Sequence, residues 1–344
     1  MTSRERVKQA MELGTPDKVP YWCLLSLEHI ITHGMKDEKQ PTTIEELVEA
    51  EIKLTKEYNF DGGLIYLPGD RENANIESFI TRSVSGAPVG ESTNDFETAD
   101  PEKWDLEIPE YGEEDFYSSH YARNLLGKDY HIGGWAACGF SRAIQWFPSL
   151  EEGMMALLLD PLKFKSLVKY FDNISIAWAK AQIEIGKLES IQISSPYAGS
   201  AFISKESYDD LVLPSVSRLA EEIKKSNGYS YIHTCGSIND RIEILADSGT
   251  NGIECMDPPP LGDITLDAAK SRVGERIFLK GNLDSVNILL QASDDEVEEV
   301  VKNTIQAGKN NGGYILSSAC SISRDVNPER IKSISKMIDK YGQY

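Results

Sequence analysis

The chain has 344 residues, of which 40% are hydrophobic and 26% charged. This is enough for one large core or two medium domains, and it excludes a disordered chain or a disulfide-stapled mini-protein. The 35 basic and 55 acidic residues give a formal net charge of −20, which repels the phosphates of nucleic acids and the surfaces of anionic membranes, so we expect neither as a partner.

Eight short runs rich in Val, Ile, Leu and Tyr alternate with longer segments of helical periodicity. Such runs are typical of buried strands in βα units. The predicted strands are residues 19–25, 63–67, 130–136, 190–195, 229–233, 251–255, 276–280 and 313–318. The clearest predicted helices are residues 43–58, 161–185, 205–226, 238–247, 294–307 and 328–341.

Eight strand and helix units in one chain favour an α/β fold of the closed (β/α)8 (TIM) barrel type, which needs about 250 residues plus insertions. We expect residues 1–344 to form a single barrel domain. The surplus falls mainly at residues 70–129, between the second and third predicted strands, where the sequence is acidic and poor in helical periodicity. We expect this insertion to be irregular or to form short hairpins over the barrel mouth. An open doubly wound sheet is the competing architecture.

The ends and the cysteines indicate a compartment. The first residues contain no apolar signal-peptide core, and no run of about 18 apolar residues could span a bilayer, so we expect a cytoplasmic protein. The five cysteines are an odd number and are widely scattered, which fits reduced thiols or metal ligands better than a disulfide framework.

The residues most informative about chemistry stand at the ends of predicted strands. His233 and Cys235 are two residues apart after the fifth strand, so their side chains point to the same side, and Cys320 follows the eighth strand. In a barrel, these strand ends form the active-site face. One imidazole and two thiolates suit zinc and leave a fourth position for a substrate or a labile ligand. Core packing is the other interpretation, because buried cysteines and histidines are common in protein interiors.

Other residues at the same strand ends are candidates for the site. Glu254 ends the sixth strand and could be the labile fourth zinc ligand with a catalytic role. Because side chains alternate along a strand, only one of Glu254 and Cys255 should face the cavity. Asn282, after the seventh strand, could orient a substrate or cap a turn. Six aromatic residues near strand ends could line an apolar substrate pocket, with core packing as the alternative: Tyr21, Trp22, Tyr66, Trp135, Tyr197 and Phe202.

Several segments resemble the uroporphyrinogen decarboxylase superfamily, and within it the zinc-containing, corrinoid-dependent methyltransferases related to methylcobamide:coenzyme M methyltransferase. These segments occur in the superfamily's order, at residues 3–6 with 16–20, 195–200, 208–214, 233–236, 281–284 and 313–317. The resemblance runs almost from end to end. It implies a (β/α)8 barrel and a zinc site at His233, Cys235 and Cys320, with Glu254 near the position of an acidic ligand.

The resemblance also implies an enzyme that moves a methyl group between a corrinoid and a small molecule, such as a thiol or a methylated donor. Residues 129–134 fit the Asp-x-His-x-x-Gly pattern of cobalamin proteins, but they lie in a predicted barrel strand and lack the pattern's later elements. We therefore expect a separate partner protein to carry the corrinoid. The sequence leaves open the methyl donor or acceptor and the direction of transfer, and a homodimer is the default expectation for the assembly.

One departure separates this chain from the decarboxylases that it resembles. They resemble one another in an Arg-rich loop after the first strand, which binds the carboxylates of their substrate, whereas this chain has no Arg between Arg6 and Arg71. Its net charge of −20 also disfavours a polyanionic substrate. A uroporphyrinogen decarboxylase-like carboxy-lyase is therefore the alternative enzyme, and a zinc-binding, corrinoid-docking scaffold is the non-enzyme alternative.

Overall fold

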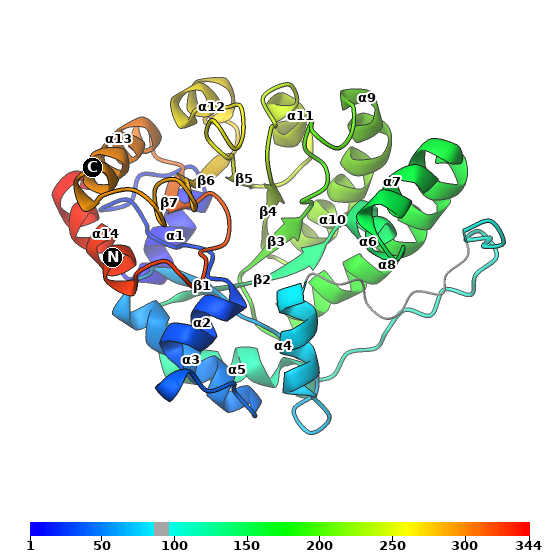
Figure 1. Cartoon of the computed structure of the whole chain (residues 1–344), viewed down its shortest axis with the longest axis horizontal. Coiled ribbons are helices and arrows are strands. Elements are labelled where there is room, and N and C mark those ends of the chain that lie inside the picture. The colour runs from blue at the N-terminus through cyan, green and yellow to red at the C-terminus, as the bar shows by residue number, and fades with distance from the viewer. Residues whose placement is uncertain (86–95) are drawn as a thin grey trace.

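A curled parallel sheet lies at the centre of the computed structural model, which describes residues 1–85 and 96–344 (Figure 1). Its strands are β1 (Gly62–Leu64), β2 (His131–Ala137), β3 (Ser190–Ser194), β4 (Tyr229–Thr234), β5 (Gly252–Cys255), β6 (Phe278–Leu283) and β7 (Tyr314–Ser318). They pair in parallel and in chain order from β1 to β7. A doubly wound sheet would reverse its strand order at a switch point, so that alternative is wrong.

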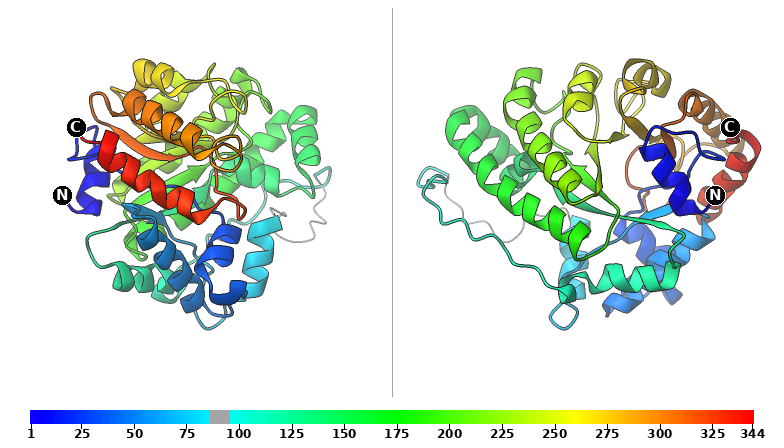
Figure 2. Two further views of the ribbon diagram at one scale, coloured as in Figure 1. Left: turned by 60° about the vertical axis from the view of Figure 1, so that its left-hand side comes forward. Right: turned by 180° about the vertical axis from the view of Figure 1, so that it is seen from behind.

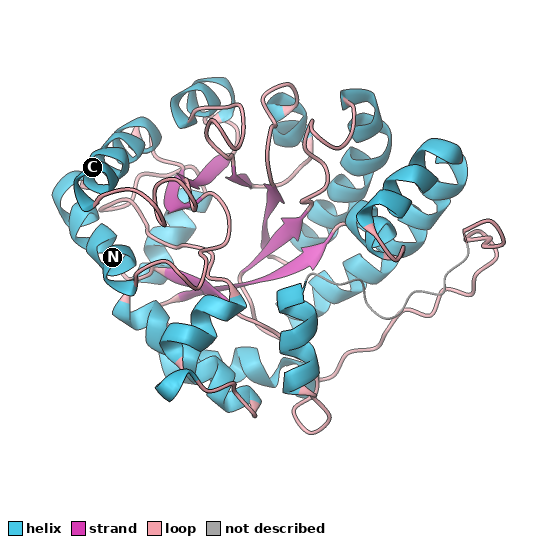
Figure 3. Ribbon diagram, in the orientation of Figure 1, coloured by secondary structure: helices cyan, strands magenta, loops and turns pink. Residues whose placement is uncertain are grey.

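Helices cover the outer face of the sheet, as Figure 3 shows. The longer ones are α1 (Ser3–Met11), α2 (Leu27–Gly34), α3 (Ile44–Glu57), α4 (Ile76–Ser85), α5 (Tyr117–Leu126), α7 (Leu150–Leu159), α8 (Pro161–Glu184), α10 (Leu213–Lys225), α12 (Leu266–Val273), α13 (Asp294–Lys309) and α14 (Pro328–Tyr341). The shorter ones are η1 (Lys36–Glu38), η2 (Glu113–Phe116), α6 (Gly139–Gln145), α9 (Lys205–Ser207), η3 (Tyr208–Val212) and α11 (Ile242–Asp247). Among the described residues, no helix is both long and apolar enough to cross a bilayer.

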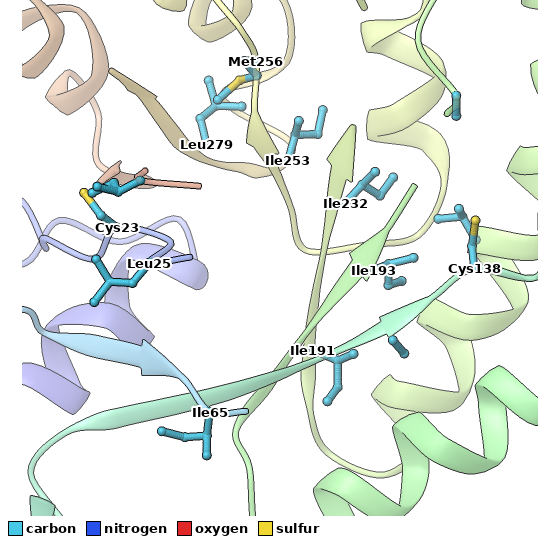
Figure 4. Close-up of a cluster of buried hydrophobic side chains, with 14 of the residues drawn as sticks. Cys23, Leu25, Ile65, Cys138, Ile191, Ile193, Ile232, Ile253, Met256 and Leu279 are labelled. Atoms are coloured by element: carbon cyan, nitrogen blue, oxygen red, sulfur yellow. The ribbon is translucent and has the colours of Figure 1, made fainter. Parts of the chain in front are cut away.

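Each strand divides its side chains between the helices and the interior of the curl. Ile191, Ile193, Ile232, Ile253 and Leu279 are buried in the hydrophobic core between the sheet and the surrounding helices (Figure 4). The residues that alternate with them on the inward face include the polar side chains of Gln192, His233, Glu254 and Lys280. Period-two alternation therefore places apolar residues under the helices and leaves the inside of the curl for chemistry.

Residues 20–25 bridge the two edges of the sheet. On one side, the amide of Trp22 donates to the carbonyl of Leu316 in β7 (3.0 Å). On the other side, the amide of Asp61, just before β1, donates to the carbonyl of Tyr21 (2.7 Å). The predicted strand at 19–25 is nevertheless wrong, because only isolated bridges form there. Pro20 has no N–H to donate, and the Tyr21 amide donates to the Asp61 carboxylate instead of a backbone carbonyl (2.9 Å), so no ladder develops.

Helix α1 packs against the amino-terminal end of the curl. Val7, Ala10 and Met11 from α1 form a buried apolar cluster with Trp22, Tyr231 and further strand residues. Helix α1 lies behind the sheet in Figure 1 and in front of it in the right-hand view of Figure 2. The opposite, carboxyl-terminal end of the strands is therefore the side on which a site can be reached.

The insertion between β1 and β2 differs from the prediction. Its described residues contain α4, η2 and α5, joined by irregular chain, and no hairpin forms among them. Helix α4 packs beside α2. The Phe96 ring contacts the Phe147 ring edge-on (5.4 Å between ring centroids), and the Trp104 ring contacts the Trp146 ring (5.7 Å). This part of the insertion therefore packs against the helical region after β2. Residues 86–95 of the insertion lie outside the described residues.

Candidate metal centre and active site

A row of polar side chains crosses the inside of the curl on neighbouring strands. The register pairs His233 on β4 with Glu254 on β5, and Glu254 with Lys280 on β6. All three side chains are at least nine-tenths buried. Adjacent parallel strands with a shared inward face therefore bring an imidazole, a carboxylate and an ammonium group together.

The carboxylate of Glu254 is fully engaged. Its Oε1 accepts from Nζ of Lys280, and its Oε2 accepts from Nε2 of Gln192 and is paired with Nδ1 of His233 (2.9 Å). Burial alone would raise the pKa of Glu254, but the charge of Lys280 and the hydrogen bond from His233 lower it to about 2. Glu254 is therefore an ionised group inside the protein, and it fixes the orientation of the His233 ring.

The opposite edge of the His233 ring faces two thiols. Sγ of Cys235 lies 3.3 Å from Nε2 of His233 and 3.9 Å from Sγ of Cys320. Both cysteines follow the carboxyl ends of their strands, β4 and β7, and both are partly exposed, whereas His233 is buried. The structure thus brings together the three residues that the sequence selected as zinc ligands, at the end of the curl where a substrate can approach.

A third thiol belongs to the same group, which the sequence did not predict. The ligand atoms of His233, Cys235 and Cys255 all lie within 4.8 Å of one another, so these residues form a potential metal site. The expectation that only one of Glu254 and Cys255 faces the cavity is wrong. Alternation requires an extended backbone, and Cys255 (φ 80°) and Met256 (φ 51°) leave that conformation, which turns the thiol inward beside Glu254.

The thiols resist ionisation in this arrangement. Contact with Cys235 lowers the pKa of Cys255, but burial and the Asp257 carboxylate raise it to about 12. Contact with Cys235 and burial raise the pKa of Cys320 above its ordinary value. Neighbouring thiolates repel one another, and a bound cation would relieve that repulsion. The donor set of nitrogen and sulfur is the one that zinc prefers.

Three polar residues of the site were missed by sequence reasoning: Gln192, Asp257 and Lys280. Asp257 accepts from the amide of Gly236 (2.7 Å), which ties the chain after Cys235 to the chain after Cys255. Lys280 is the last residue of the predicted strand 276–280 and follows three apolar residues, and this position was a signal for a buried cation. Gln192 occupies an inward position between two isoleucines of β3, but it carried no motif that the sequence analysis could use.

Asn282 and the six aromatic candidates fall into different environments. The amide of Asn282 donates to the carbonyl of Met256 (2.9 Å), so it braces the end of β5. Tyr21 and Trp22 are each 1% exposed and offer no surface to a ligand. The hydroxyl of Tyr66 donates to the carbonyl of Leu25 (3.2 Å). The aromatic residues with accessible surface are Trp135, 40% exposed, and Phe202, 44% exposed, whose ring packs edge-on against the half-buried Tyr197.

Comparison with known proteins identifies the family. The sequence profile "Uroporphyrinogen decarboxylase (URO-D)" matches residues 87–341, most of the chain. The chain belongs to the URO-D family. It is 27% identical over 187 residues to a uroporphyrinogen decarboxylase of Ruthia magnifica, an alignment that covers 54% of this chain and 51% of that protein. It is 26% identical over 227 residues to the methylcobamide:CoM methyltransferase MtbA of Methanosarcina acetivorans, covering 66% of this chain and 61% of that protein.

The aligned regions therefore span about half to three fifths of the length of these curated relatives. A solved structure, a methyltransferase from Methanosarcina mazei, superimposes with a TM-score of 0.77 and covers 99% of both chains at 17% identity. At this identity the likeness shows a shared fold. This URO-D family member is thus similar to relatives of two kinds, decarboxylases and methyltransferases.

The segment after residue 19 bears on the choice between these two chemistries. This URO-D family member has no Arg between Arg6 and Arg71. The buried His29 in that segment is committed to the carbonyl of Ser323 and the hydroxyl of Tyr58 (2.9 Å each). Arg6 itself is bound to Asp17 and Asp61. The segment therefore presents no arginine to a polycarboxylate.

Proposed function

We propose that this URO-D family protein is a zinc-dependent methyltransferase, which moves a methyl group between a corrinoid carried by a partner protein and a small thiol or methylated substrate. The observation that carries the proposal is the convergence of His233 with the thiols of Cys235 and Cys320 at the open end of the curl. The resemblance to methylcobamide:CoM methyltransferases supports the type of reaction.

His233, Cys235 and Cys320 would hold the zinc ion. When bound, zinc would supply positive charge that favours the deprotonated form of a substrate thiol near neutral pH. Glu254 acts as a positioning residue, because its contact with Nδ1 of His233 keeps Nε2 directed at the thiols. Lys280 neutralises Glu254 on its other oxygen. A labile zinc bond from Glu254 would require it to leave Gln192, Lys280 and His233, so we assign it to orientation.

The proposed reaction balances without an added oxidant or reductant. In the direction of thiol methylation, the sulfur of the substrate thiolate attacks the methyl carbon, an S–C bond forms and the Co–C bond breaks, with its electron pair left on cobalt as Co(I). The proton of the thiol is released to solvent. The exposed face of Trp135 offers an apolar surface for the substrate.

The architecture of the proposed enzyme is a (β/α)8 barrel in one domain over residues 1–344. The hydrogen bonds from residues 20–25 to β7 and to Asp61 support it, since this segment occupies the position of an eighth strand between β7 and β1. A homodimer stays a prediction.

Zinc content together with methyl transfer tests the proposal. The full chain and its Cys320→Ala variant are reconstituted with zinc. Cys138→Ala serves as the control because it removes another free thiol, which is buried and follows β2. We expect about one zinc per chain in the wild type and Cys138→Ala, and a clear loss in Cys320→Ala. Each protein is then mixed with methylcobalamin and a panel of thiols, and methyl transfer is monitored by the visible absorption of cobalamin. We expect transfer in the proteins that retain zinc.

The remaining outcomes separate the alternatives. A wild type that binds no zinc refutes the proposal and brings the carboxy-lyase forward. Zinc binding without transfer to or from any thiol or methylated compound, with free or protein-bound corrinoid, would favour the docking scaffold.

A further inference from the structure

The thiol of Cys255 has an environment that packing alone does not require. Its side chain is completely buried, and its neighbours include the polar groups of Cys235 and Asp257. It lies with His233 and Cys235 in a group whose ligand atoms are all within 4.8 Å of one another. A left-handed backbone at a non-glycine residue (φ 80°) turns it there. Such a conformation is uncommon for a side chain with a Cβ atom, and it points to a functional constraint.

We infer that Cys255 is a fourth protein ligand of the metal, so that the resting site is closed by one imidazole and three thiolates. This inference rests on the proposed zinc site and adds a ligand to it. Cys235 connects the two halves of the set: it contacts His233, Cys255 and Cys320. The four donors come from three strand ends, those of β4, β5 and β7.

The neighbouring carboxylate is a poorer candidate for the fourth position. Glu254 meets the Nδ1 edge of the His233 ring, whereas Cys235 meets the Nε2 edge. Both oxygens of Glu254 are already bound by Gln192, Lys280 and His233. The buried charge of Lys280 would be left without its counter-ion if Glu254 moved to the metal, which is unfavourable in a buried site. Cys255 reaches the sulfur cluster without breaking any of these contacts.

A closed site has a chemical consequence. Catalytic zinc sites usually keep one position for water or substrate, whereas four protein ligands are typical of structural sites. With four protein ligands the metal would have no vacant position for water, so a substrate thiol would need to replace the Cys255 thiolate, which would take up the proton of the entering thiol.

Cobalt substitution of the full chain counts the thiolates. Charge-transfer absorption from thiolate to Co(II) scales with the number of bound sulfurs, so Cys255→Ala should lose about a third of the wild-type intensity per bound cobalt. It should still bind cobalt, through the three remaining ligands. Cys138→Ala, which removes another fully buried thiol, should match the wild type. Circular dichroism of each protein verifies the fold.

A measurement on the unaltered chain makes the test independent of whether Cys255→Ala folds. X-ray absorption of the zinc-loaded wild type should give three sulfur neighbours and one nitrogen. Two sulfurs in the wild type, or undiminished charge-transfer intensity in Cys255→Ala, would overturn the inference. In that case a metal-bound wild type that loses its metal in Cys320→Ala would leave the proposed function standing, whereas a wild type without metal would refute both.

Discussion

At the scale of single residues, the buried pair of Lys280 and Glu254 is the most consequential contact of the site. Lys280 is 1% exposed, and its Nζ lies 4.6 Å from the ring centroid of Trp22. We predict that Lys280→Met costs about 3–5 kcal/mol of unfolding free energy, because it leaves the Glu254 carboxylate buried without its counter-ion. Urea unfolding measures the cost.

Two further variants make this prediction specific. The double variant Lys280→Met with Glu254→Gln should recover part of the loss, since it removes both charges together. Lys103→Met breaks an exposed pair with Asp100 and should change stability by less than about 1 kcal/mol. A Lys280→Met effect no larger than that of Lys103→Met would show that the buried charge is solvated in another way.

Glu51 on α3 gives a pH dependence that is independent of the metal centre. Its side chain is buried, its Oε2 has no hydrogen-bond partner among the described residues, and burial raises its pKa to about 8. Between the ordinary pKa of a glutamate and pH 8, the unfolded chain is ionised here while the folded chain holds a proton. Wild-type stability should therefore fall as pH rises through this window, and the loss should be complete above pH 8.

The variant Glu51→Gln should remove this dependence, because an amide cannot ionise. Its stability relative to the wild type should rise from pH 5 to pH 8, by an amount on the order of a few kcal/mol, and then level off. Denaturant unfolding at intervals of pH gives the two curves. Glu57→Gln, an exposed position at the end of the same helix, should run parallel to the wild type. Parallel curves for Glu51→Gln as well would mean that Glu51 is ionised in the folded protein.

What could be foreseen at this scale depended on the backbone being regular. His233, Cys235 and Cys320 follow strands whose ends are marked in the sequence, and the structure brings them together. The inward turn of Cys255 depends on its φ angle. The orientation of Glu254 toward His233 depends on its partners in β3 and β6, which lie 62 and 26 residues away in the chain. No local pattern carries that information.

At the scale of elements, Gln182 on α8 binds the part of β2 that extends beyond its pairing with β1. Strand β1 ends at Leu64, opposite Gly133, while β2 continues to Ala137. The Gln182 side chain accepts from the amide of Trp135 (3.1 Å) and donates to its carbonyl (3.0 Å). The helix thus supplies the hydrogen bonds that β1 would have made.

We predict that Gln182→Ala destabilises the protein by about 1–3 kcal/mol, because the amide of Trp135 loses its partner and the carbonyl of Trp135 keeps only the bond from Nε1 of Trp178 (3.2 Å). The amide of Trp135 should exchange its hydrogen faster, which mass spectrometry of deuterated peptides measures. Gln145→Ala, at an exposed position of α6, should leave both quantities unchanged. Unaltered exchange at Trp135 in Gln182→Ala would show that water replaces the side chain at no cost.

The elements themselves were largely predictable. Seven of the eight predicted strands are present, since each is a short run rich in apolar residues and is buried along almost its whole length. The run at 19–25 looked the same but formed only isolated bridges, because its amide pattern is interrupted by Pro20 and by a carboxylate 40 residues away. Helices α4 and α5 escaped prediction, since the acidic, Gly- and Pro-containing sequence around them hid their periodicity.

At the scale of the whole molecule, Asp61 ties together three parts of the ring. Its Oδ1 accepts from Arg6 of α1 (2.6 Å), and its Oδ2 accepts from the amide of Tyr21 (2.9 Å). Its own amide donates to the carbonyl of Tyr21, immediately before β1 begins. The charge of Arg6 opposes the effect of burial, which raises the pKa of Asp61. One carboxylate therefore connects the helix at the base, the bridging segment and the first strand.

We predict that Asp61→Ala costs about 3–5 kcal/mol and opens the junction between β7 and β1, because it leaves the buried Arg6 side chain and the Tyr21 amide without this partner. Thermal unfolding gives the cost, and amide exchange at Tyr21, Trp22 and Leu316 reports the opening. Asp17→Ala is the matched control, since Asp17 binds the same Arg6 but is 42% exposed, so its loss should be much smaller. Equal losses in the two variants would mean that apolar packing against α1 holds the ring closed, and that the polar junction adds nothing to it.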